Sequence, residues 1–293
     1  MSEVRKKRYW GKTLVAFFVV LCSMPLGHAL MVLMEAFLEA SALHHAAFLM
    51  GFVGLVIVIV GVFIRGDVKQ TLCGLFGGLL YWVGWIEFLF QYYANRWGTQ
   101  PDIDEVTGEV VSKPEYVIMP ATFGIFMMFM VLYLFTSRTG CCFLNWCQRR
   151  IFRTRRELLP PPPRRHTSVT TFLELNIMMW ACYLVLMFCY DKEFLGDKHP
   201  VTFGVGFVCL LSAVYMFIKE LHIGAWGANI RMAIATVIIF WTPVEILMRN
   251  DFTTEIWVEP QKYRGAMYGI LAVFVVLIVW IIVAAALRKR SAH

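Results

Sequence analysis

The chain has 293 residues, of which 59% are hydrophobic and 16% charged, and its formal net charge is +7. Its mean hydropathy is +0.64, whereas soluble domains carry about 25% charged residues because their surfaces must be hydrated. The composition therefore excludes a soluble domain and indicates that lipid is the main solvent of the folded chain.

Long apolar runs alternate with short polar stretches along the whole sequence. A helix needs about 20 apolar residues to cross the hydrocarbon core of a bilayer. Eight segments meet this requirement: 13–35, 42–64, 70–93, 118–137, 170–190, 201–218, 229–249 and 265–287. The alternating pattern of membrane β-barrels does not occur. We therefore predict an all-α integral membrane protein with eight spans.

The first span, 13–35, follows a basic stretch, as the apolar part of a signal peptide would. The run continues from Met31 to Glu35 without a small-residue cleavage site, so we expect a retained helix. Met24, His28, Met31 and Glu35 recur at helical spacing, which places them on one helix face. Ionisable groups inside a span are costly, and they therefore predict a functional role.

Later spans add ionisable residues close to the same side of the membrane. His44 and His45 begin span two, and Glu87 lies near the outer end of span three. In the second half of the chain, His199 precedes span six and Glu245 lies near the outer end of span seven. Together with the face of span one, these residues predict a polar layer toward the outer leaflet.

Three interpretations of the polar layer remain open. Carboxylates and imidazoles that change charge suit a solute or ion pathway, for which the candidates are His28, Glu35, Glu87 and Glu245. Imidazole and thioether groups suit copper, iron or zinc, for which the candidates are His28, Met31, Glu35, His44, His45 and His199. The absence of His-x-x-x-His and Cys-x-x-Cys spacings disfavours the metal site. In the third interpretation, side chains near helix ends simply reach the lipid headgroups.

The regions between spans four and five and between spans three and four have distinct patterns. In the outer loop 94–117 we predict a small hairpin that turns at Thr107-Gly108. On the other side, 141–147 combines cysteines with large apolar residues before two arginines, which predicts an amphipathic segment on the membrane surface. A basic stretch with four consecutive prolines follows, and we interpret 151–165 as a linker.

The two halves of the chain share short motifs in the same order. The pairs are His44-x-x-x-Phe48-x-x-Gly51 with His199-x-x-x-Phe203-x-x-Gly206, Tyr81-Trp82 and Glu87 with Phe240-Trp241 and Glu245, Phe123-Gly124-Ile125 with Tyr268-Gly269-Ile270, and Val32-Leu33-Met34 with Val185-Leu186-Met187. We therefore predict a parallel 4+4 repeat with units 1–150 and 166–293, because four spans return the chain to its starting side. At this register, His28 corresponds to Ala181, so the polar layer is expected to be asymmetric.

Lysine and arginine gather on one side of the predicted topology. They lie in 1–12, 65–69, 138–169, 219–228 and the C-terminal tail, whereas most acidic residues lie in the other loops. Because positive residues mark the cytoplasmic side, both termini are predicted to be cytoplasmic, as in a multi-pass protein of a bacterial inner membrane. The basic segments are expected to contact anionic lipid. They are not interpreted as a nucleic-acid site.

These patterns favour a polytopic protein that binds or translocates a small solute or ion through the outer polar layer. A second hypothesis is a non-catalytic accessory or scaffold subunit of a larger membrane complex, since the loops are short. A third is a membrane-embedded metal or redox enzyme that uses the His/Glu layer. Phosphate-loop, dinucleotide, Gly-x-Ser-x-Gly and His-Glu-x-x-His motifs are missing from the sequence, which favours a protein without catalytic activity.

Overall fold

The computed structural model describes residues 8–103, 110–136, 142–150, 166–250, 252, 256 and 260–290. Its helices are α1 (Trp10–Phe37), α2 (Ala40–Phe63), α3 (Asp67–Tyr81), the π-helix η1 (Trp82–Glu87), α4 (Phe88–Arg96), α5 (Pro114–Ile118), the 3₁₀-helix η2 (Met119–Thr122), α6 (Phe123–Thr136), α7 (Cys142–Arg150), α8 (Thr167–Tyr190), α9 (Pro200–Glu220), α10 (Trp226–Arg249) and α11 (Arg264–Arg290). Strands β1 (Asp102–Ile103) and β2 (Val110–Ser112) pair antiparallel.

Within the described residues, eight helical segments are long and apolar enough to cross a membrane. They are Trp10–Phe37, Ser41–Phe63, Asp67–Arg96, Pro114–Leu134, Thr167–Tyr190, Pro200–Glu220, Trp226–Arg249 and Arg264–Ala284. The predicted class, a helical multi-pass membrane protein, is thereby confirmed. Which side faces the cytoplasm, and whether the membrane is a bacterial inner membrane, stay predictions.

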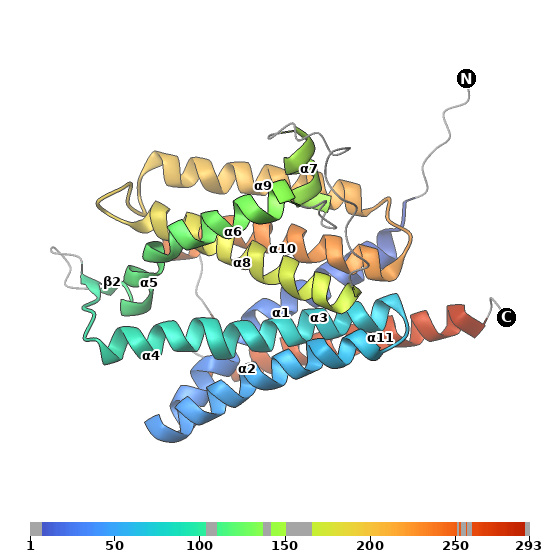
Figure 1. Cartoon of the computed structure of the whole chain (residues 1–293), viewed down its shortest axis with the longest axis horizontal. Helices are drawn as coiled ribbons and strands as arrows, with labels where there is room; N and C mark the ends of the chain where they lie inside the picture. Colours follow the sequence, from blue (N-terminus) through green and yellow to red (C-terminus); the bar gives the residue numbers. More distant parts are fainter. Residues whose placement is uncertain are drawn as a thin grey trace.

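The long membrane-spanning helices lie roughly along one common direction, so the bundle has two ends (Figure 1). The β1–β2 pair and α5 lie at the left of the view, and we call this the hairpin end, with the connections 38–39 and 191–199. Helix α1 begins and α11 ends at the right. We call this the terminal end, with the connections 64–66 and 221–225.

Four helices form the interior of the bundle. The most apolar part of α10 is 67% buried, that of the third span, Asp67–Arg96, is 50% buried, and those of α1 and α8 are each 44% buried. In contrast, only 11% is buried in α11 and in the fourth span, Pro114–Leu134. The core accordingly consists of side chains such as Val19, Leu75, Leu175 and Ile230, each almost fully buried. The outer helices expose apolar side chains, as expected for surfaces that face lipid rather than water.

Small residues allow α2 and α3 to pack closely. A side chain added at Gly54 would lie 2.6 Å from the Gly77 oxygen, and one at Gly84 would lie 2.5 Å from the Ala47 oxygen. Glycine at such positions lets two backbones approach, which is the main source of helix association when lipid already solvates apolar side chains. The contact fixes η1, and therefore Glu87, relative to α2.

Three further expectations concern local structure. The hairpin forms from β1 and β2, although its turn at Thr107-Gly108 lies outside the described residues. The predicted amphipathic segment forms the helix α7, which ends with Arg149 and Arg150. The linker 151–165 also lies outside the described residues.

Candidate functional site

A cavity of about 340 Å³ lies between α1, α3–η1, α8 and α10. Its lining begins near the middle of the helices, at residues such as Ser23, Leu79 and Ile238, and extends to Lys113 and Arg249 at the hairpin end. This volume falls at the lower end of the range of small-molecule sites, roughly 300–1,000 Å³. The cavity is therefore large enough for a small solute.

Helix α1 contributes one face to the cavity. Ser23, Met24, Gly27 and His28 line it, and their spacing places all four side chains toward the same neighbours. Met31 belongs to the same helix but packs into the buried core instead. The residues of the predicted face of span one are thus divided between the cavity and the core. His28 is the ionisable residue of this face that lines the cavity.

His28 and Glu87 form a pair across the cavity wall. The His28 Nδ1 atom lies 3.2 Å from Glu87 Oε1, and the two side chains are 23% and 18% exposed. Glu87 is the last residue of η1, where the helix takes π geometry. Single π turns inside α-helices are rare and often occur at functional sites. The pair therefore joins α1 to an irregular part of the third span.

The second carboxylate of the cavity comes from α10. Glu245 Oε1 accepts a hydrogen bond of 2.6 Å from Trp241 Nε1, one helical turn away. Glu245 and Lys113 both lie within electrostatic range of the His28 imidazole. Two acids and one imidazole from three spans therefore share one polar environment. Of the four predicted pathway residues, these are His28, Glu87 and Glu245, and their role in a pathway stays a prediction.

Cationic groups lie where the cavity meets the hairpin end. The Arg249 guanidinium stands 4.2 Å from the centre of the Tyr190 ring and donates to Ser112 Oγ at 3.0 Å. Its Nε atom is 3.9 Å from Asp197 Oδ2. Lys113, an exposed residue just before α5, also lines the cavity. A ligand entering from this end would pass both positive groups before reaching the carboxylates.

The cavity wall contains buried polar atoms that are poorly satisfied. Nε2 of His28 has no hydrogen-bond partner, and the hydroxyl of Thr242, whose side chain is nearly fully buried, meets the weakly hydrogen-bonding thiols of Cys182 and Cys209. Leaving a buried donor or acceptor unpaired costs about 1–3 kcal/mol. A polar ligand in the cavity would remove this cost, so these atoms are the strongest local indication of a binding site.

The remaining predicted residues lie elsewhere. Glu35 is exposed beyond the cavity, near the hairpin end of α1. The His44 ring lies 4.6 Å from the Tyr92 ring, and His45 Nδ1 lies 2.6 Å from the Ser41 oxygen. These positions suit contacts near a membrane surface and do not converge on the cavity.

The candidate metal ligands are not gathered into one centre. His199 begins α9 as its N-cap and accepts from the Val201 amide through Nδ1. Among the described residues, no group of three or more His, Cys, Asp or Glu side chains is placed to hold a metal ion. The six residues that sequence suggested for copper, iron or zinc therefore find no common site in this part of the chain.

The cavity residues that sequence reasoning missed include Lys113, Thr242 and Arg249. Thr242 follows Trp241 and precedes Glu245 by about one turn, so helical spacing alone could have placed it on the same face. From the sequence, Lys113 belongs to the outer loop 94–117 and Arg249 ends the span 229–249, and neither position indicates a role. Only the folded arrangement brings them over the cavity.

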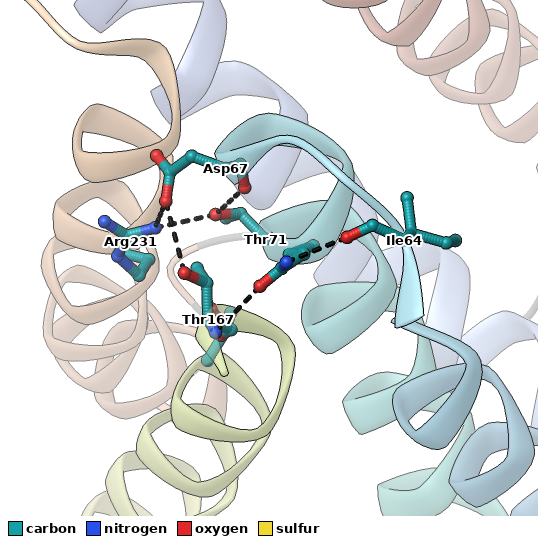
Figure 2. Close-up of polar contacts among 7 residues, drawn as sticks. Ile64, Asp67, Thr71, Thr167 and Arg231 are labelled. Carbon is teal, nitrogen blue, oxygen red and sulfur yellow. Dashed lines mark hydrogen bonds and ion pairs between the residues drawn. The ribbon is translucent and has the colours of Figure 1, made fainter. Parts of the chain in front are cut away.

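The terminal end is closed by a polar cluster that joins α3, α8 and α10 (Figure 2). Arg231 Nη1 donates to Asp67 Oδ1 at 2.9 Å and to Thr71 Oγ1 at 2.8 Å. Thr167 donates its hydroxyl to Asp67 and its amide to Gln70 Oε1. We call these five residues the clamp. It links the start of the third span with the starts of the fifth and seventh.

The fold and the cavity define a polytopic, helical membrane protein with a polar site between its central helices. No protein-family model, curated protein or solved structure matches the chain. The function is therefore argued from the geometry of the site.

Proposed function

We propose that the chain binds a small polar solute in the central cavity and moves it across the membrane. The observation that carries this proposal is the unpaired, buried Nε2 atom of His28 in a cavity that also holds Thr242, Glu87 and Glu245. Ionisable groups around a cavity at membrane depth commonly mark substrate or ion pathways. Aromatic and apolar side chains complete the wall, as in most small-molecule sites.

The packing of the helices supports a division of the chain into two similar units that pack against each other. Within each proposed unit, the second span packs on the third, as α2 on α3 and α9 on α10. Between units the contacts are reciprocal: α3 packs on α8 as α10 does on α1, and η2 packs on α8 as α11 does on α1. Such reciprocity is expected for a parallel repeat with its axis along the membrane normal.

The π-helix accounts for a difference of one residue between the proposed repeats. Glu87 follows Trp82 by five positions, whereas Glu245 follows Trp241 by four. A π turn contains about one residue more than an α turn. With η1 between them, Trp82 and Glu87 line the cavity as Trp241 and Glu245 do. One carboxylate from each unit thus faces the proposed solute.

The lining of the cavity revises the register of the first and fifth spans. Ser23, Met24, Gly27 and His28 line it from α1, and Cys182, Tyr183, Leu186 and Met187 line it from α8 with identical spacing. Each of these α8 residues follows its α1 counterpart by the same number of sequence positions as Trp241 follows Trp82. We therefore pair His28 with Met187, in place of the Ala181 suggested by sequence similarity. The imidazole stays without an ionisable counterpart.

The cavity and the clamp lie at opposite ends of the bundle. A solute would reach Glu87 and Glu245 from the hairpin end, which the distribution of basic residues predicts to be the outer side. Release at the terminal end requires the clamp to separate, so Arg231 and Asp67 would part in the alternate state. Rocking of two repeats around a fixed site is how many transporters give alternating access.

The first test is ligand binding by the purified full-length chain. Thermal stability is measured with a panel of small ammonium, carboxylate and zwitterionic compounds, for wild type, Thr242→Val and Glu245→Gln. We expect one class of compound to stabilise wild type, with at least roughly tenfold weaker binding, about 1.4 kcal/mol, in either variant. The matched control is Glu35→Gln, because Glu35 is exposed outside the cavity.

Flux of the binding compound into liposomes is the second test. We expect Glu87→Gln and Glu245→Gln to reduce flux and Glu35→Gln to leave it unchanged. Equal flux in all three variants and wild type would contradict a pathway through the cavity. A stable chain that binds no compound of the panel and co-purifies with a membrane partner would instead favour an accessory subunit.

A further inference from the structure

At the terminal end, α9 ends with a glutamate that is completely removed from solvent. Glu220 is 0% exposed, and so are its neighbours Thr13 on α1 and Asn229 on α10. Thr13 Oγ1 and Asn229 Nδ2 reach the Glu220 main-chain oxygen at 3.3 and 3.2 Å. These contacts tie α1, α9 and α10 together, but they satisfy the backbone of Glu220 and not its carboxyl group.

The carboxyl group itself lacks a partner. Neither Oε1 nor Oε2 of Glu220 makes a hydrogen bond in the structure. One side chain that interacts with this carboxyl group is Thr236, also buried, whose hydroxyl lies 2.9 Å from the Met232 oxygen as a donor. While the hydroxyl donates to Met232, Thr236 can only accept a hydrogen bond from Glu220. A protonated carboxyl could supply it, and a carboxylate could not.

The charged and titratable groups around this site are engaged elsewhere. They are Tyr9 just before α1, Lys12 on α1, Lys219 and His222 next to Glu220, and Arg231 on α10. Lys12 donates to the Gly224 oxygen, and His222 Nδ1 lies 2.9 Å from the Ile218 oxygen. The ion pairs of the described residues are His28–Glu87, Lys192–Asp102, Arg231–Asp67 and Arg249–Asp197, so Glu220 belongs to none of them.

An ionised carboxylate in this position would be a buried charge without a counter-ion. Such a group costs several kcal/mol, and it takes up a proton instead when it can. We propose that Glu220 is a proton-binding site, occupied while α1, α9 and α10 are packed together and emptied when they separate at the terminal end. Loss of the proton leaves a carboxylate that needs water, which reaches Glu220 only after that separation.

Proton binding and closure of the terminal end then favour each other by linkage. The proton site stands on the surroundings of Glu220 alone. Its use as the driving ion for a solute rests on the proposed function, because only then does opening of the terminal end release a cargo. The site lies at the end of the bundle opposite to the cavity, so the two can be tested separately.

Infrared spectroscopy of the full-length protein in lipid vesicles tests the proton site without any solute. A protonated, poorly hydrogen-bonded carboxyl has a distinct C=O stretching band. We expect this band at neutral pH in wild type, its loss in Glu220→Gln, and its retention in Glu174→Gln. Glu174 is the matched control, since it is another buried glutamate, on α8.

Two further measurements decide the outcome. Thr236→Val removes the proposed acceptor, so the Glu220 band should shift to the frequency of a less hydrogen-bonded carboxyl. Thermal stability should fall toward alkaline pH in wild type and change less in Glu220→Gln, because glutamine carries no charge. A wild-type spectrum at neutral pH that lacks the band, or a band that survives in Glu220→Gln, would overturn the proposal whether or not a solute is transported.

Discussion

His28 on α1 and Glu87 at the end of η1 lie 3.2 Å apart, Nδ1 to Oε1, in the wall of the central cavity. They come from the first and third spans and are both less than a quarter exposed. The contact therefore connects the cavity-lining face of α1 with the π-helix η1 of the third span. It also leaves the second ring nitrogen of His28 without a protein partner.

The His28–Glu87 contact should contribute measurably to stability. In a double-mutant cycle with His28→Gln and Glu87→Gln, we expect a coupling energy of about 1 kcal/mol, the usual net contribution of a side-chain hydrogen bond. Reversible unfolding in mixed detergent measures it. The same cycle with His28→Gln and Glu35→Gln should give additive effects. Additivity in both cycles would show that the contact is not energetically coupled.

The packing of α2 on α3 predicts a second contrast. Gly54→Ala should destabilise the protein by about 2 kcal/mol, because the added methyl group would meet the Gly77 backbone oxygen at 2.6 Å. Gly204→Ala is the matched control on α9, where nothing lies within 4 Å. This change should be neutral or stabilise by up to about 1 kcal/mol, since alanine favours helix. Equal melting temperatures for the two variants would refute the close approach.

The number and approximate ends of the spans could be predicted from sequence because lipid selects long apolar runs. The end of span six shows the limit of that signal. The predicted span stopped at 218, since Lys219 and Glu220 are charged, but α9 continues to Glu220. The extension is possible because Thr13 of the first span and Asn229 of the following helix pack against that residue and bury it.

The candidate site was predictable only in part, for a similar reason. Helical spacing placed His28 and Glu35 on one face, yet it could not show that Glu35 extends beyond the cavity. Nor could it show that Met31 enters the core. Glu87 and Glu245 could be recognised because ionisable residues within apolar spans are costly and therefore conspicuous. Lys113 lies in a polar loop, and its position over the cavity is visible only in the folded structure.

The clamp at the terminal end predicts an order of effects. Thr71→Val should cost about 1–2 kcal/mol, because Thr71 is fully buried and is an acceptor of Arg231. Asp67→Asn should cost about 1 kcal/mol or less and lose its effect in high salt, since the Asp67 side chain is 47% exposed. Unfolding at low and high ionic strength tests both. The reverse order would contradict the geometry of Figure 2.

The chemistry of Cys147 in α7 predicts slow modification. Burial raises the pKa of the Cys147 thiol above its ordinary value, and the thiolate is the reactive form. With the other cysteines replaced by alanine, iodoacetamide should therefore label Cys147 slowly at neutral pH. Labelling should accelerate only at higher pH than for an exposed thiol.

The matched control for Cys147 is its neighbour on the same helix. Trp146 is 44% exposed, so Trp146→Cys, combined with Cys147→Ala, should provide a thiol with ordinary access and ordinary pH dependence. If both thiols react at the same rate across the pH range, α7 does not bury Cys147 as described. Slow labelling confined to Cys147 would instead support the burial of this thiol by α7 and its neighbours.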